Sequence, residues 1–136
     1  MVEPLAARLR AMNEFEEIPN KKPGEETSDN WPELGASFPL NAFYRQFDGA
    51  EGWLGESYFT MWSRKEISEF RDPNLEAYPE RYSFFGSDGG GTQFGFIVTS
   101  EGVQFCSAPD IGAEEDVRVL GDWKEFISSI KTCDYI

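Results

Sequence analysis

Apolar side chains recur at helical spacing in four stretches of the chain. The four stretches are residues 4–13, 38–49, 63–72 and 121–130. The apolar stripe of the second stretch consists of Leu40, Phe43, Tyr44 and Phe47. Intervals of three and four residues place such positions on one helical face. Gly49 suits the C-terminal end of this second helix, because glycine tolerates positive φ. The pattern therefore predicts about four amphipathic helices.

Two of these helices begin with capping-box sequences. The two pairs of residues are Ser63 with Glu66 and Asp122 with Glu125. In a capping box each side chain satisfies a backbone N–H that the first helical turn leaves without a partner. In the third helix we expect Ile67 and Phe70 to face the core, and Asp72-Pro73 to end the helix. The apolar face predicted for the last helix consists of Trp123, Phe126, Ile127 and Ile130.

β-branched and aromatic residues dominate one short segment before the third predicted helix. They also dominate several short segments between the third and the fourth. The predicted strands are residues 57–63, 81–86, 92–99, 103–108 and the short segment 117–120. Tight turns separate most of them, so consecutive strands are expected to pair antiparallel. The fold class predicted is α+β, a single domain over residues 1–136, with a mainly antiparallel sheet and about four helices packed on it.

Residues 13–34 do not follow either periodicity. Three prolines, glycine and many charged residues make this segment a long acidic loop. Trp31 is unusual in such a loop. The sequence leaves two positions open for it: packed back against the core, or exposed for a partner.

Composition narrows the possible functions. The chain of 136 residues has 25 acidic and 12 basic side chains, a net charge of −13, and no histidine. Without histidine, the commonest general base and most zinc sites are excluded. The negative surface repels nucleic acid and anionic lipid, and favours basic partners. We therefore expect a protein that is not an enzyme and has no cofactor or metal, although an acidic surface also serves solubility alone.

The remaining sequence features indicate the cellular compartment in which the protein is expected. No run of apolar residues approaches the roughly 20 needed to span a membrane, and the first residues do not resemble a signal peptide. We expect a cytoplasmic protein in which Cys106 and Cys133 are reduced thiols.

The sequence FFGSDGGGTQFGF, residues 84–96, contains three consecutive glycines. No lysine lies between Lys65 and Lys124, so the segment is not a Walker loop. Phe94 occupies the position of the third glycine of a dinucleotide-binding motif. A calcium loop needs several spaced carboxylates, whereas only Asp88 is present. We interpret the segment as a strand-turn-strand unit in which Asp88 accepts hydrogen bonds from the amides that follow it.

This segment resembles the central signature of the SUKH superfamily, which is named partly for a fungal cell-wall regulator. The structural positions that match the signature are Asp88, Gly89, Gly90 and Gly91. Residues 38–55, 58–70 and 121–130 resemble the helix, the strand with its following helix, and the closing helix of that family. The resemblance covers roughly residues 35–130, and it implies an α+β fold of the SUKH type.

The resemblance also implies function by binding. Many bacterial members are immunity proteins that bind and neutralise a cognate toxin, often a nuclease, and no catalytic residue carries over. Because a nuclease is usually basic, an acidic inhibitor complements it. The alternatives are a regulatory or scaffold module that binds an endogenous protein, and a small ligand-binding domain that uses carboxylates. Neither the toxin nor the oligomeric state follows from the sequence.

Acidic residues next to an aromatic residue are the candidate partner-binding positions, because aromatic side chains anchor interfaces and charges guide association. For each cluster the alternative is a solvated charged loop. The first cluster consists of Glu25, Glu26, Asp29 and Trp31. The second consists of Glu114, Glu115 and Asp116. The third, which we rank lowest, consists of Asp48, Glu51 and Trp53.

Overall fold

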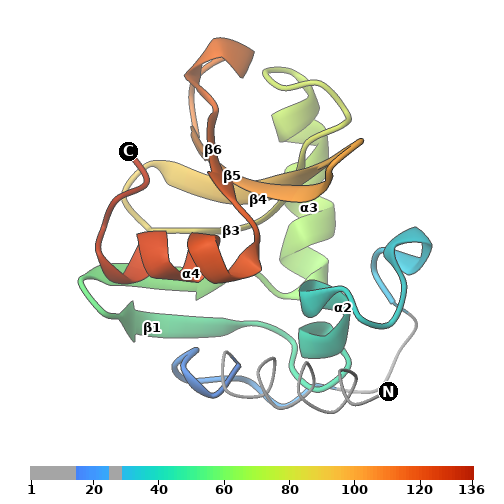
Figure 1. Cartoon of the computed structure of the whole chain (residues 1–136), viewed down its shortest axis with the longest axis vertical. Coiled ribbons are helices and arrows are strands. Elements are labelled where there is room, and N and C mark those ends of the chain that lie inside the picture. The colour runs from blue at the N-terminus through green and yellow to red at the C-terminus, as the bar shows by residue number, and fades with distance from the viewer. Residues whose placement is uncertain (1–14, 25–28) are drawn as a thin grey trace.

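The computed structural model describes residues 15–24 and 29–136 of the protein. Six strands form one antiparallel sheet in which every strand lies beside its neighbours in sequence (Figure 1). The strands are β1 (Ala50–Leu54), β2 (Ser57–Met61), β3 (Ser83–Ser87), β4 (Thr92–Thr99), β5 (Gly102–Pro109) and β6 (Arg118–Gly121). The predicted single α+β domain with a mainly antiparallel sheet is confirmed.

Three α-helices and two short 3-10 helices accompany the sheet in the described part of the chain. They are η1 (Pro32–Leu34), α2 (Pro39–Tyr44), α3 (Arg64–Leu75), η2 (Glu114–Asp116) and α4 (Trp123–Lys131). The prediction of about four helices is thus slightly different from the structure, and the helix expected at 4–13 lies outside the described residues. None of the helices described here is long and apolar enough to cross a membrane.

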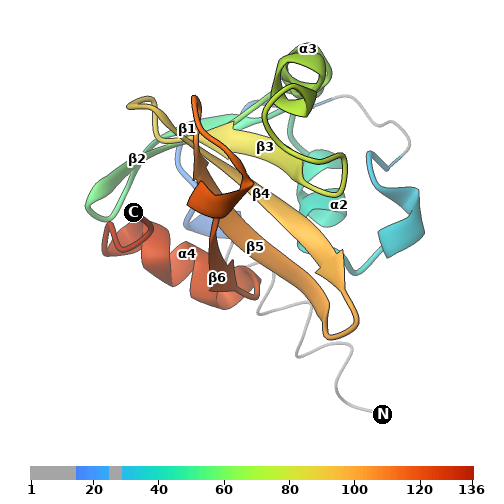
Figure 2. The same cartoon turned by 90° about the horizontal axis from the view of Figure 1, so that it is seen from above.

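The main core lies between the sheet and α4. Figure 2 shows α4 and α3 on opposite sides of the sheet. We call the face that packs against α4 the inner face, and the face toward α3 the outer face. Phe126 of α4 is fully buried in the centre of the core. The rings whose centres lie within about 6 Å of it belong to Phe59, Phe85, Phe94, Phe105 and Trp123. The predicted apolar face of α4 is confirmed, since all four residues are buried.

Both predicted capping boxes are present. The Glu66 amide donates to Ser63 Oγ at 3.2 Å, and the Ser63 amide donates to the Glu66 carboxylate at 3.0 Å. However, α3 does not end at Asp72-Pro73. It continues through Pro73 to Leu75. Pro73 has no N–H, so the last turn lacks one hydrogen bond. The Glu76 amide donates to the Pro73 carbonyl at the C-terminal end of the helix. The predicted end was therefore wrong by about one turn.

Two further predictions from periodicity need correction. Phe70 was expected to face the core, but it is 40% exposed and packs against the Trp62 ring at 4.7 Å. The helix predicted to reach Gly49 ends at Tyr44 instead, and Phe47 lies in an isolated bridge with Pro23. Gly49 has a φ of +104° and no room for a side chain, because a Cβ would come within 2.7 Å of a backbone oxygen.

Strand β1 was not predicted. Its sequence AEGWL contains a glycine and a glutamate, and it lacks the run of β-branched residues that identifies the other strands. Pairing with β2 in continuous register, from Ala50 opposite Met61 to Leu54 opposite Ser57, is what makes this segment a strand.

Candidate partner-binding surface

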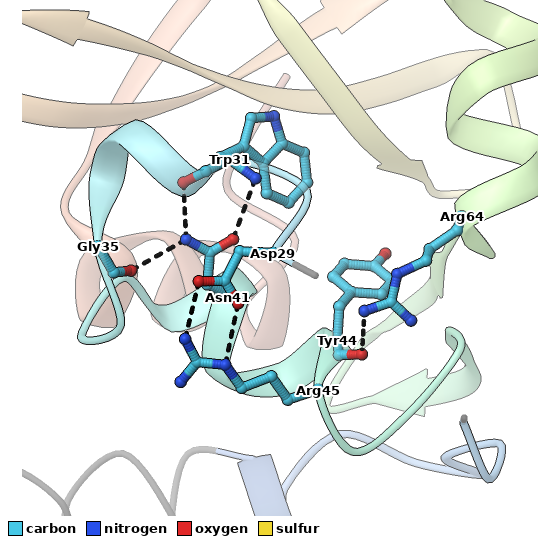
Figure 3. Close-up of polar contacts among 7 residues, drawn as sticks. All are labelled: Asp29, Trp31, Gly35, Asn41, Tyr44, Arg45 and Arg64. Atoms are coloured by element: carbon cyan, nitrogen blue, oxygen red, sulfur yellow. Dashed lines mark hydrogen bonds and ion pairs between the residues drawn. The ribbon is translucent and has the colours of Figure 1, made fainter. Parts of the chain in front are cut away.

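The first acidic cluster holds its own loop in place. Glu25 and Glu26 lie outside the described residues. The Asp29 carboxylate accepts hydrogen bonds from Arg45 Nε at 2.9 Å and Nη2 at 2.7 Å (Figure 3). Such a two-point pair between arginine and carboxylate has a specific geometry. Asp29 therefore fastens the loop to the C-terminal end of α2.

Trp31 occupies the first of the two positions that the sequence left open, against the core. Its ring packs edge-on against Phe38, Tyr44 and Phe96 at 5.3 to 6.2 Å between ring centres. The buried Asn41 amide holds the same loop. Its Nδ2 donates to the carbonyls of Trp31 at 2.8 Å and Gly35 at 2.9 Å, and its Oδ1 accepts from the Trp31 amide (Figure 3). Trp31 thus anchors the fold.

Arg64, the first residue of α3, makes the corresponding link between the loop and α3. Its guanidinium donates to the Tyr44 carbonyl (Figure 3). It also donates to Asn30 Oδ1. Burial, and then the charge of Asp48, raise the pKa of the Tyr44 hydroxyl, which donates to the Trp62 carbonyl at 2.6 Å. Sequence analysis missed Asn41, Arg45 and Arg64 because their partners lie 6 to 34 residues away.

The second acidic cluster is largely occupied by contacts within the protein. Glu114 pairs with Arg81 and accepts a hydrogen bond from the Tyr82 hydroxyl at 3.0 Å. Asp116 accepts from the Ala113 amide at 2.9 Å. Of the three carboxylates, only that of Glu115 has no bonded partner among the described residues. The cluster mainly connects the segment after β5 to the segment before β3.

The third cluster, ranked lowest from sequence, contains the most exposed aromatic side chain of the described residues. Trp53 is 68% exposed, and it packs edge-on against Tyr58 with 5.8 Å between ring centres. Glu51 accepts a hydrogen bond from the Tyr58 hydroxyl at 3.0 Å and lies 3.8 Å from Lys22 Nζ. Asp48 is different, because its carboxylate accepts the first amide of α3, that of Arg64. Trp53 is therefore available. Glu51 lies half-exposed beside it but is already bonded to Tyr58 and close to Lys22, and Asp48 is structural.

Glu51, Trp53, Tyr58 and Thr60 lie together on the outer face of β1 and β2, and we call them the Trp53 surface. Their neighbours Ala50, Leu54, Phe59 and Met61 belong to the main core. Because side chains alternate along a strand, the members of the Trp53 surface point away from α4. Strand register continues their row across the sheet, from Glu51 through Thr60, Ser87 and Gln93 to Ala108.

A hollow of about 290 Å³ lies above this row, beside α3. Its lining consists of Trp62, Phe70, Pro73, Asn74, Ser87, Gln93 and Asp110. The buried Gln93 amide donates to Asn74 Oδ1 at 2.8 Å, which ties the floor of the hollow to α3. Burial and the neighbouring charge of Asp88 raise the pKa of Asp110 at its rim. The hollow is thus acidic at one side and aromatic at the other.

A larger hollow, of about 470 Å³, lies on the opposite flank of α3. One wall is the α3 face that carries Arg64, Ile67 and Arg71, and the other walls come from residues 30–33 and 78–84. Arg71 and Glu80 face each other across it at 3.4 Å. Both basic and acidic side chains line this hollow, so its charge does not favour either an anionic or a cationic ligand.

The glycine turn borders the Trp53 surface. Asp88 Oδ1 accepts the amides of Gly90 at 2.7 Å and Thr92 at 3.1 Å, which confirms the predicted turn. Its Oδ2 accepts the Tyr135 hydroxyl at 3.0 Å. Gly89 has a φ of +74°, and a Cβ built there would lie 3.7 Å from the ring of Tyr58. The signature residues therefore form the border of the Trp53 surface. Both carboxylate oxygens of Asp88 already accept hydrogen bonds from groups of the same protein.

Comparisons with known proteins add no family assignment. No protein-family model matches the chain, and no curated protein matches its sequence. Within the part of the chain that the structure describes, no three acidic or cysteine side chains converge as metal ligands would. The arrangement of the Trp53 surface, an exposed tryptophan packed against a half-buried tyrosine with a carboxylate beside them, is suited to contact with another protein.

Proposed function

We propose that the protein binds a basic protein partner through the Trp53 surface. Following the resemblance to the SUKH superfamily, we further propose that this partner is a toxin, which the protein neutralises as its immunity protein. The single observation that carries the binding proposal is the exposure of Trp53 beside Tyr58 and Glu51, on a sheet face that α3 leaves uncovered.

The energetics of interfaces support this choice of surface. Tryptophan and tyrosine are the residues that most often dominate binding energy, because they bury a large area at little cost in side-chain entropy. Trp53 already has its ring oriented by Tyr58, and Tyr58 is held by Glu51. A partner would therefore meet an anchor whose position is set before binding.

The net charge supports the choice of partner. At −13, the protein attracts basic surfaces and accelerates their association at low salt. A nuclease carries positive charge where it binds its polyanionic substrate, and an acidic inhibitor can use that charge. The proposal therefore predicts a strong dependence of the association rate on ionic strength.

The test is co-expression with the polypeptide encoded beside the gene of this protein, followed by purification and stopped-flow binding. We expect a stable complex and protection of cells from the toxicity of that polypeptide. Trp53→Ala should weaken affinity at least about tenfold, as expected for an interface anchor. Glu51→Lys should slow association and flatten its salt dependence. Glu101→Lys, the same charge reversal in the distant β4–β5 turn, is the matched control and should retain most of the affinity.

Three results would contradict the proposal. The neighbouring polypeptide could fail to bind, or it could bind the Trp53→Ala protein as tightly as the unaltered one. In addition, a growth or cell-wall defect of a deletion strain grown without any toxin would favour the regulatory alternative.

A further inference from the structure

The hollow of about 290 Å³ beside α3 begins next to the Trp53 surface. Ser87, which lines the hollow, lies opposite Thr60 in the strand register, and neighbouring strands are only about 4.8 Å apart. The volume is at the lower limit of sites for small molecules, which measure about 300 to 1,000 Å³. The hollow therefore fits a single side chain of a partner that also covers Trp53.

The floor of the hollow contains a buried amide with one unused acceptor. Gln93 is 2% exposed, and its Nε2 donates to Asn74 Oδ1 at 2.8 Å and to the Pro109 carbonyl at 3.4 Å. These two acceptors fix which end of the amide is the nitrogen. Its Oε1 accepts a hydrogen bond from none of the residues that the structure describes. Because a buried acceptor without a donor costs free energy, the floor favours a ligand that donates.

The rim and one wall of the hollow favour a positive charge on that ligand. Asp110 is exposed at the rim, and its carboxylate has no donor or cationic partner within residues 15–24 and 29–136. Burial and the charge of Asp88 raise the pKa of Asp110, so a bound cation would stabilise its charged form. At the other side, the 40% exposed ring of Phe70 packs on Trp62. Aromatic ring faces also attract cations.

The described arginines all have other partners. The pairs are Arg45 with Asp29, Arg64 with Tyr44 and Asn30, Arg71 with Glu80, Arg81 with Glu114, and Arg118 with Asp134. The residues that border the undescribed segments do not line the hollow either. Phe15, Gly24 and Asp29 contact Phe43, Gln46 and Arg45, which belong to α2 and the residues just after it. A cation for the hollow is therefore expected from another molecule.

From these contacts we infer that the hollow receives an arginine side chain of the basic partner. The inference rests on the proposed function, because it assigns one anchor of the same partner. A guanidinium is planar and carries five N–H donors, so it can donate to Gln93 and Asp110 and stack on Phe70. A lysine ammonium is more strongly hydrated and does not stack. Arginine is also among the side chains that most often dominate binding energy at interfaces.

The first test does not need the partner, because it uses arginine capped at both ends as the probe. NMR follows the side-chain amides of Gln93 and Asn74 and the indole N–H of Trp62 during titration at constant ionic strength. We expect shifts that saturate with a dissociation constant on the order of 1 mM, as suits a single side chain. The side-chain amide of Gln104, which does not line the hollow, is the internal reference.

Two further probes separate charge from shape. Capped citrulline has nearly the same shape as arginine but is neutral, and it should bind at least about tenfold more weakly. Capped lysine keeps the charge without the planar group, and it should bind about threefold more weakly than arginine.

Variants of the protein test the rim and the wall separately. Asp110→Asn should weaken the binding of capped arginine about threefold, as expected for an exposed ion pair. Phe70→Leu, which removes the aromatic face, should weaken it by a similar factor. Glu115→Gln is the matched control, because it removes a nearby carboxylate that has no bonded partner among the described residues. It should leave the affinity unchanged.

Three results would overturn the inference: no saturating shift at the Gln93 amide, equal binding of citrulline and arginine, or an equal loss in the Asp110→Asn and Glu115→Gln proteins. The inference also fails if the Gln93 amide of the free protein shifts after Arg8→Gln and Arg10→Gln together. That result would assign the hollow to the chain's own N-terminal segment.

The second test uses the complex with the polypeptide encoded beside the gene. When each arginine of that polypeptide is replaced by lysine in turn, one replacement should weaken binding at least about threefold. Its effect should be smaller against the Asp110→Asn protein, as in a double-mutant cycle. A complex that leaves the Gln93 amide unshifted would overturn the inference while the proposed function stands. Binding of capped arginine without any complex would overturn the proposed function and leave the hollow as an arginine site.

Discussion

Helices α3 and α4 begin with the same capping motif but pack differently against the sheet. Each opens with a capping box, Ser63 with Glu66 in α3 and Asp122 with Glu125 in α4. Yet α4 buries Trp123, Phe126, Ile127 and Ile130, whereas α3 has no buried residue at all, although it is three residues longer. Local capping energy is thus alike in the two helices, and the difference lies entirely in packing.

The difference in packing between α4 and α3 indicates which side of the sheet stabilises the fold and which side is free for binding. α4 closes the core against the inner face of the sheet. α3 rests on the outer face with Ile67 half-buried and Phe70 and Leu75 exposed, and a hollow remains on each flank. Uncovered sheet next to a lightly packed helix is where a partner can gain buried area without displacing the core.

The largest expected effect comes from removing one ring from each helix. Phe126→Ala should lower the free energy of unfolding by about 3 to 5 kcal/mol, because it leaves a cavity among five aromatic neighbours. Phe70→Ala, the matched change in α3, should cost about 1 kcal/mol or less, since the ring is already partly in water. Urea denaturation measures both. Equal losses would show that α3 is as much a part of the core as α4.

Asp88→Ala should have the next largest effect. The change removes the acceptor of two backbone amides and of the Tyr135 hydroxyl, which belongs to the segment that follows α4. Hydrogen bonds to a charged group are each worth about 1.5 to 3 kcal/mol, so we expect a loss of roughly 2 kcal/mol or more. Asp88→Asn, which keeps an acceptor oxygen, should restore part of it. Unaltered thermal stability would show that the glycine turn does not anchor the α4 side.

Removing the two caps compares the helices most directly. Asp122→Ala and Ser63→Ala each remove an N-cap acceptor worth about 1 kcal/mol. For α4 we expect this loss in global stability, because α4 unfolds only with the core. For α3 we expect less global loss and faster amide exchange confined to residues 64–67, since a lightly packed helix can fray alone. Exchange that rises across the whole protein after Ser63→Ala would contradict this difference.

The smallest expected effect is a difference in thiol reactivity between the two cysteines. This difference measures how well the outer face of the sheet is shielded from solvent. Cys106 is buried on the outer face of β5, and burial raises the pKa of its thiol from 9.0 to about 12. Cys133, just after α4, is exposed. A thiol reagent should modify Cys133 rapidly and Cys106 only at the rate of opening.

The same pKa shift gives a dependence of stability on pH. The folded protein keeps the Cys106 proton up to about pH 12, whereas the unfolded chain loses it from about pH 9. The stability that this group contributes is therefore complete below pH 9 and is lost as the pH rises toward 12. Denaturation at pH 8 and pH 10.5 tests this, and Cys106→Ser should reduce the difference.

Much of the fold was predictable because its signals are local. Capping boxes, the stripe of α4, the alternation in β3 to β5 and the turn formed by Asp88 all depend on residues within a few positions of each other. The end of α3 was mispredicted, because an inference from Pro73 alone does not include the turn that continues beyond it. Strand β1 escaped prediction, since its only strong strand signal is its pairing with β2.

The candidate surface was predictable only in part. Sequence analysis named Glu51 and Trp53, but ranked them below Trp31 and Glu114. The structure reverses that order, because Trp31 packs against Phe96 and Glu114 pairs with Arg81. Both partners are distant in sequence, and nothing in the local pattern reveals them.

What the sequence determined by itself is most of the helices and strands, the antiparallel α+β architecture, the negative charge and the turn at the three glycines. Each of these depends on composition or on near neighbours. Only the tertiary structure decided which aromatic and acidic residues remain available. Exposure depends on long-range contacts, and those contacts pack Trp31 against the core while leaving Trp53 of β1 68% exposed.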